Sequence, residues 1–170
     1  MIEFSIYGHP ATQGSKKVVP IYKAGAPMIK NGRVLTRVVN DNPKTAEWRQ
    51  EIAHAARQAY RGELLTGPLC LAVTFYKPRP KGHFGSGRNA GTLKESAEKY
   101  PISKPDTVKL VRALEDSLTG VIWKDDSQVV THVLHKRYGE YFKVEVCVLK
   151  MEDYVEPGVS IFKPIDKENV

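Results

Sequence analysis

The chain has 170 residues, a mass of 19.1 kDa and a formal net charge of +7, which fits one domain with a short tail. Apolar residues make up 41% and charged residues 26%, which is ordinary globular usage and excludes a wholly disordered chain. No apolar run reaches the ~18 residues of a membrane span, and the first residues lack the pattern of a secretory signal, so we expect no membrane association.

The basic residues are unevenly distributed along the chain. They are in excess in residues 1–40 and 77–104, whereas acidic residues concentrate in residues 105–149 and in the tail. A basic surface attracts polyanions, because binding them releases counterions. Nucleic acid is therefore one interpretation of the charge, and solubility alone is the other.

The N-terminal region predicts β structure. Residues 2–7 alternate between apolar and polar side chains, which is typical of a half-buried strand. Residues 18–22 and 33–39 are also β-prone, and Asn31-Gly32 between them is a strong signal for a tight turn. We therefore expect a hairpin or an irregular β excursion there.

Two helices are predicted further along. Asn42 and Pro43 open the first, since Asn caps helices and Pro is tolerated at the first helical position, and Gly62 ends it. Asp106 is placed to cap the second helix, whose apolar stripe runs to Leu118.

Three further strands complete the predicted order. They cover residues 69–76, 128–136 and 141–149, and a long loop over residues 77–104 follows the first of them. A loop of that length in a compact domain is usually functional or disordered. The order predicts an α+β fold in which a mixed sheet is covered by two helices.

Acidic residues bracket the second helix. Asp106 stands at its start, and Asp125-Asp126 follow its end. Adjacent carboxylates are costly unless they are solvated or share a cation, and such oxygen ligands suit Mg²⁺ or Mn²⁺. A helix of about 12 residues is roughly 18 Å long, so its two ends need not be close. A plain cap for Asp106 and a solvated turn for Asp125-Asp126 are the alternatives.

Two basic segments are candidates for DNA contact. One is in the long loop, where aromatic residues lie nearby, and the other is near the N-terminus; a solvated mobile loop is the alternative for the first. The candidates are Lys77, Arg79, Lys81, His83 and Arg88 in the loop, and Lys16, Lys17, Lys30, Arg33 and Arg37 near the N-terminus. The histidines lack zinc spacing with cysteine, and Cys70 and Cys147 are interpreted as reduced thiols in strands.

One long block carries a family resemblance. Lys104-Pro105-Asp106, Lys109-Leu110, Arg112, residues 116–120 and residues 123–129 resemble the signature of RusA-family Holliday junction resolvases. Gly8-His9-Pro10, the helix with Trp48 and residues 76–81 are similar to phage-type members. The resemblance covers residues 1–149, and residues 150–170 form an acidic C-terminal extension outside it.

The resemblance implies a homodimeric, Mg²⁺-dependent endonuclease that cuts four-way DNA junctions by paired, symmetric nicks in recombination and repair. Such an enzyme acts in the cytoplasm of a bacterium or a phage-infected cell and needs no small-molecule cofactor. By resemblance, Asp106 and Asp126 are catalytic and bind the metal, with Asp125 as a neighbouring ligand. Arg112 takes the basic position, from which it would stabilise charge on the phosphate.

Val108 departs from the family pattern, which has a second catalytic Asp at this position. Valine cannot bind a metal, so cleavage should fall by orders of magnitude if the metal geometry needs that carboxylate, while DNA binding survives. The alternative to an active resolvase is therefore a catalytically impaired junction-binding protein. A basic nucleic-acid module whose acidic residues are only caps and turns is a third interpretation.

Overall fold

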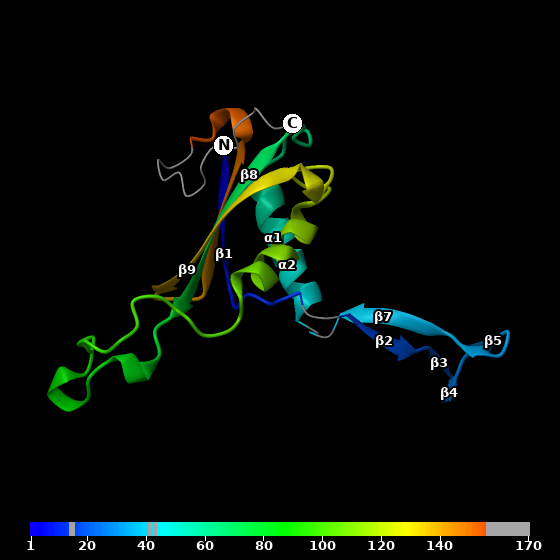
Figure 1. The fold of residues 1–170 in the computed structure, drawn as a ribbon, viewed down its shortest axis with the longest axis horizontal. Helices are drawn as coiled ribbons and strands as arrows, with labels where there is room; N and C mark the ends of the chain where they lie inside the picture. Colours follow the sequence, from blue (N-terminus) through cyan, green and yellow to red (C-terminus); the bar gives the residue numbers. More distant parts are fainter. Residues whose placement is uncertain (14–15, 41, 43, 156–170) are drawn as a thin grey trace, which may run out of the picture.

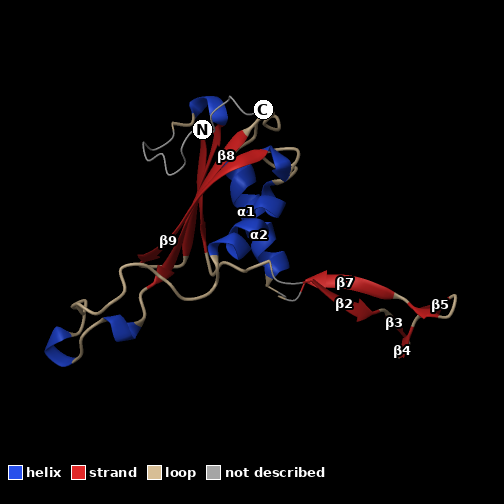
Figure 2. Ribbon diagram, viewed as in Figure 1, coloured by secondary structure: helices blue, strands red, loops and turns tan. Residues whose placement is uncertain are grey.

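The computed structural model describes residues 1–13, 16–40, 42 and 44–155, and two helices cover one face of its central sheet (Figures 1 and 2). The strand order in the sheet is β1-β10-β8-β9. Neighbouring strands pair antiparallel, except that β8 and β9 are parallel. The strands are β1 (Ile2–Tyr7), β8 (Leu69–Pro78), β9 (Val129–Gly139) and β10 (Lys143–Lys150). The predicted α+β fold with a mixed sheet and two helices is confirmed.

The core lies between the sheet and the helices α1 (Thr45–Ala59) and α2 (Thr107–Leu118). Successive strand residues face opposite sides of the sheet, so alternate residues of the strands turn toward the helices. Among the described residues, the largest fully buried side chain is Trp123, which follows α2. The core includes Leu71, Val73 and Phe75 of β8, Val144, Val146 and Val148 of β10, Ile52 of α1, and Leu110 and Leu114 of α2.

The start of α1 differs from the sequence-based expectation. The cap position is Lys44, and Asn42 instead accepts a hydrogen bond from the Lys44 backbone N–H at 3.1 Å. Its side-chain amide also donates to the carbonyl of Thr12 at 3.4 Å. The expected cap at Asn42 is therefore wrong, because the side chain forms a turn before the helix, as Asn often does. Pro43 lies outside the described residues.

Residues 16–40 form an arm of paired strands that extends away from the sheet (Figure 1). At its base β2 (Lys16–Pro20) pairs with β7 (Thr36–Asn40). Farther out, two short ladders continue it, namely β3 (Tyr22–Lys23) with β4 (Ala26–Pro27) and β5 (Ile29–Lys30) with β6 (Arg33–Val34). Asn31 and Gly32 both have positive φ, 51° and 72°, which is typical of a tight hairpin turn. The predicted β excursion is confirmed.

The connection between β8 and β9 contains the long loop and α2. The loop has two short 3-10 turns, η1 (Lys81–His83) and η2 (Gly87–Asn89), and a third, η3 (Asp126–Gln128), follows α2. Since β8 and β9 are parallel, this connection must return from the end of β8 to the start of β9. The N-terminal end of α2 therefore lies beside the ends of the two strands, and η3 lies at their beginnings.

The C-terminal part continues past β10 into η4 (Met151–Asp153), and residues 156–170, most of the expected acidic extension, lie outside the described residues. Both cysteines are free; Cys70 is buried and Cys147 is half-buried. None of the helices in the described ranges is long and apolar enough to cross a membrane.

Candidate active site

Asp106 occupies the cap position of α2, but its side chain makes no capping hydrogen bond. Its Oδ2 atom lies 3.0 Å from Nζ of Lys109, one turn into the helix. The hydrogen bond and the charge of Lys109, together with the charges of Lys104 and Lys136, lower the pKa of Asp106 below its ordinary value. The carboxylate is therefore ionised at neutral pH and exposed beside the positive end of a helix.

Two lysines from the sheet hold the segment that leads into α2. Lys136 of β9 donates to the carbonyls of Ser103 at 2.8 Å and Pro105 at 3.1 Å. Lys77 of β8 donates to the hydroxyl of Ser103 at 3.0 Å. These bonds fix the position of Asp106 relative to the sheet, and they keep positive charge beside it.

Val108 and Arg112 share the exposed side of α2, one turn apart. The side chain of Val108 is 61% exposed, so the packing of the core does not require an apolar residue there. Arg112 is exposed as well. By contrast, Asp116 has a structural role, because its carboxylate lies 3.8 Å from Arg49 of α1 and its carbonyl accepts a hydrogen bond from the same side chain.

Asp125 and Asp126 lie after the other end of α2, where Asp125 caps η3. The carboxylate of Asp125 accepts a hydrogen bond from the Ser127 backbone N–H at 2.9 Å, and Gln128 completes a capping box by accepting from the Asp125 backbone. The hydrogen bonds with Ser127 lower the pKa of Asp125. Gln128 also donates to the carbonyl of Leu65 at 2.9 Å, which anchors this turn to the start of the sheet. Asp126 is exposed.

The structure does not bring Asp106 and Asp126 together within one chain. Asp106 precedes α2 and Asp126 comes after it, and the 12 residues of the helix span roughly 18 Å. In the described ranges, no group of three or more His, Cys, Asp or Glu side chains gathers in a way that could hold a metal ion. The carboxylates are chemically suitable for a hard cation, but the single chain divides them between two places.

The basic loop residues divide into two kinds. Lys77 and Arg79 fasten the loop, since Arg79 donates to the carbonyl of Glu98 at 2.9 Å and its guanidinium stacks over the ring of Tyr138, 4.3 Å from the centroid. Lys81 in η1 and Arg88 in η2 are exposed at the outer turns of the loop.

The arm is basic along its whole length and contains no acidic residue. Its six cationic residues are Lys16, Lys17, Lys23, Lys30, Arg33 and Arg37. Lys17 is exposed, as are Lys30 and Arg33 near the tip, whereas the side chain of Lys16 lies outside the described part. The arm and the long loop extend from the same end of the body as the start of α2, on opposite sides (Figure 1).

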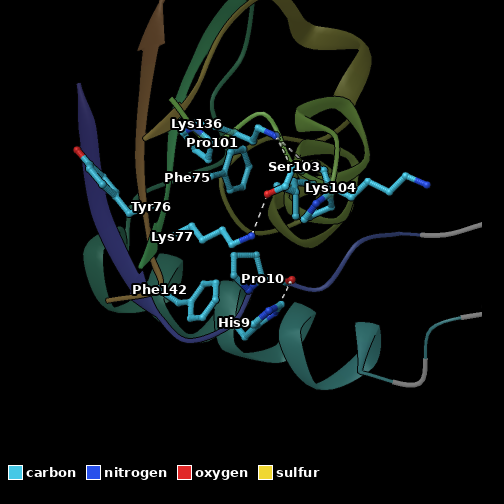
Figure 3. Close-up of a pocket in the computed structure, with 12 residues that line it drawn as sticks. His9, Pro10, Phe75, Tyr76, Lys77, Pro101, Ser103, Lys104, Lys136 and Phe142 are labelled. Atoms are coloured by element: carbon cyan, nitrogen blue, oxygen red, sulfur yellow. Dashed lines mark hydrogen bonds between the residues drawn. The ribbon is translucent and has the colours of Figure 1, made fainter. Parts of the chain in front are cut away.

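Two features of this region were missed by sequence reasoning. His132 of β9 lies 2.7 Å from the carboxylate of Glu115 on α2 and ties the helix to the sheet. A pocket beside the Asp106 segment is lined by His9, Phe75 and Phe142, among others (Figure 3). Gly8-His9-Pro10 stands out in the sequence, but no local pattern indicates that the sheet places His9 next to Phe142.

Comparisons with known proteins agree with these observations. The profile of the family described as "Endodeoxyribonuclease RusA" matches residues 21–149. The chain is also 37% identical, over 150 residues, to the "Uncharacterized protein YqaN" of Bacillus subtilis (strain 168), an alignment that covers 86% of this chain and 94% of that protein. The matched region includes α2, both acidic positions and most of the arm.

The contact between Lys109 and Asp106 predicts the titration of this carboxyl. Replacing Lys109 with Met should raise the pKa of Asp106 toward its ordinary value, because the ionised form no longer has its strongest partner. In the native protein the Lys109 contact stabilises the fold above the ordinary Asp pKa, and this contribution disappears as the pH falls through the lowered pKa. Carboxyl ¹³C NMR titration measures the shift, with Asp125 as the internal control; an unchanged pKa of Asp106 would contradict the assignment.

Proposed function

Because this chain belongs to the RusA family of endodeoxyribonucleases, which are Holliday junction resolvases, we propose that it binds four-way DNA junctions and cuts them by paired, symmetric nicks during recombination and repair. The family match over residues 21–149 carries the proposal. The exposed, ionised Asp106 and the basic arm and loop support it, since an enzyme acting on DNA needs both carboxylates and a surface for phosphate. We place its action in the cytoplasm of a bacterium or a phage-infected cell.

RusA-family nucleases are generally dependent on a divalent metal. We propose Mg²⁺ for this chain, with Mn²⁺ as a second choice, held by Asp106, Asp125 and Asp126, whose oxygens are the hard ligands that these ions prefer. When bound, such an ion polarises the scissile phosphate and lowers the pKa of its bound water.

A homodimer explains how the separated carboxylates form one site. In a two-fold arrangement, Asp106 of one copy can approach Asp125 and Asp126 of the other, and the symmetry creates two equal sites. Two equal sites are what paired, symmetric nicks require. The exposure of all three carboxylates supports this arrangement, since each is available to a second copy.

The remaining residues of the proposed site act on the DNA backbone. Arg112 is exposed on α2, six residues after Asp106, and would stabilise the charge that develops on the phosphate during cleavage. The guanidinium keeps the positive charge of the lysine that the family usually has there, but offers a planar fork in place of a point charge. Lys81 and Arg88 on the loop would contact backbone phosphates, with Lys77 and Arg79 holding that loop in place.

The arm is proposed as a ribbon that contacts one duplex of the junction, with Lys16 and Lys17 at its base. A two-stranded ribbon has little core and is marginally stable by itself, so a partner would order it. The major groove of DNA admits a two-stranded β ribbon. The absence of acidic residues over residues 16–40 favours a polyanion as that partner.

Val108 supports a second candidate function, a junction-binding protein with impaired catalysis. The position lies two residues after Asp106 on the same exposed helix surface, where the family pattern has an Asp. Without that carboxylate the metal loses one of its ligands, while the basic surfaces that bind DNA are unaffected.

The proposed activity is tested with a labelled four-way junction and a matched linear duplex, each with and without Mg²⁺. We expect symmetric nicks in the junction only, and only with the metal. Asp126→Asn should reduce nicking about 100-fold or more, because a metal ligand supplies several kcal/mol to the transition state. Asp153→Asn, an exposed acid in η4, is the control and should cut normally. Equal, salt-sensitive binding to both DNAs without cutting would reject the resolvase assignment.

Restoring the carboxylate at position 108 separates the two candidate functions. Val108→Asp should fold normally because the side chain is 61% exposed, and an acid in the first turn of a helix stabilises it by about 0.5 kcal/mol. If catalysis is impaired, metal-dependent nicking should rise at least tenfold. Val155→Asp, at an exposed valine outside both acidic positions, is the matched control and should leave nicking unchanged. No gain in Val108→Asp would show that this carboxylate is not the limiting element.

The contribution of the arm is read from the salt dependence of junction binding. Replacing Lys30 and Arg33 near the tip with Gln should flatten the plot of log affinity against log salt by about 0.9 for each phosphate that the arm no longer neutralises. Arg57→Gln with Arg61→Gln removes the same charge from exposed positions at and after the end of α1, and should leave the slope unchanged. Equal slopes for the two double variants would exclude the arm from the DNA interface.

A further inference from the structure

A pocket of about 180 Å³ opens beside the segment that carries Asp106 (Figure 3). Pro105, the residue immediately before Asp106, forms part of its wall. The pocket is smaller than the roughly 300–1,000 Å³ typical of sites for drug-sized ligands. Its size therefore suits a single small ring system.

The walls of the pocket are flat and mostly apolar. Phe75 is 4% exposed and comes from β8, and Phe142 comes from the turn before β10. His9 packs against Phe142 with 4.3 Å between the ring centroids. Pro10 is buried and lies next to His9 in the wall of the pocket (Figure 3). Because these residues follow or belong to different strands of one sheet, the sheet fixes the spacing of the rings. Rings of this kind favour a planar, stackable ligand.

One polar group crosses the pocket. The ammonium of Lys77 reaches between Phe75 and the His9–Phe142 pair to the hydroxyl of Ser103, at 3.0 Å (Figure 3). A lysine ammonium carries three N–H donors, so Lys77 can keep this bond and donate a second one to an acceptor on a ligand. Lys136 is bound to the Ser103 and Pro105 carbonyls, Tyr76 turns away to Glu145, and Lys104 extends away from the other lining side chains (Figure 3).

We propose that this pocket holds one unstacked nucleobase of the junction, next to the phosphate presented to Asp106. The inference rests on the proposed function, since Pro105, the neighbour of Asp106, lines the pocket and DNA bound at Asp106 would lie beside it. A nucleobase has stackable faces for Phe142 and His9, and ring acceptors at its edge for Lys77. Base pairs at the exchange point of a junction adjoin the strand crossover, where the continuous stack of a duplex is interrupted, so taking a base out of the stack costs less there than within a duplex.

The test asks whether removing the Phe142 ring and removing one base of the junction weaken binding through the same interaction. Wild type and Phe142→Ala are titrated against junctions that carry a single abasic site at successive positions around the cut. On the intact junction, Phe142→Ala should weaken binding about tenfold, the effect expected of removing one base–aromatic stack. At one abasic position the wild type should bind more weakly by a similar factor, and there Phe142→Ala should cause no further weakening.

Two controls separate the pocket from general damage. Tyr141→Ala removes the neighbouring aromatic ring, which is 61% exposed and outside the pocket, and should bind every junction as the wild type does. Phe142→Leu keeps apolar volume but removes the flat ring, and thermal unfolding checks that it folds as the wild type does. It should still bind the intact junction more weakly, and it should lose no further affinity at the same abasic position as Phe142→Ala.

The outcomes distinguish the two proposals. Junction-selective binding in which Phe142→Ala costs the same factor at every abasic position would overturn the base pocket and leave the proposed function standing. Junction binding by the wild type no tighter than duplex binding would overturn both. A single coupled position supports the pocket and identifies the nucleotide that it holds.

Discussion

The parallel pairing of β8 with β9 is the constraint on which the rest of the structure depends. Parallel strands begin at the same end of the sheet, so the chain between Pro78 and Val129 has to cross from one end to the other. Helix α2 makes the return, which places Asp106 beside the ends of both strands and Asp125 beside their beginnings. The separation of the two acidic positions is therefore a consequence of strand topology.

The end of the sheet that carries Asp106 is organised by lysines with two roles. Lys77 and Lys136 reach from neighbouring strands to the segment before α2, and their hydrogen bonds hold its backbone in place. The same positive charges lie close to the site where we propose that phosphate binds. Arg79 also combines a structural contact, stacking on Tyr138, with a position in the basic loop. Substituting Lys77, Lys136 or Arg79 would therefore disturb the position of the loop as well as the proposed contact with DNA.

The arm and the long loop extend from this same end on opposite sides of the body (Figure 1). This arrangement suits a ligand larger than the protein, which the two extensions can contact while the start of α2 faces it. A small-molecule enzyme would more typically enclose its substrate in a deep cleft. The pocket between Phe75 and Phe142 is the exception at this end, and its size suits one ring system rather than a whole nucleotide chain.

The sequence by itself determined the elements whose signals are local: the two helices, the tight turn at Asn31-Gly32, the α+β class and the family signature around α2. Side-chain periodicity and turn propensity act over a few residues, so they can be read from the chain. Tertiary structure alone decided that Asn42 forms a turn rather than a cap, that Asp106 and Asp126 lie apart, and that His9, Phe75 and Phe142 line one pocket. The turn at Asn42 is held by its contact with the distant Thr12 as well as by Lys44, and the other two outcomes follow from strand pairing between distant segments, which no local pattern encodes.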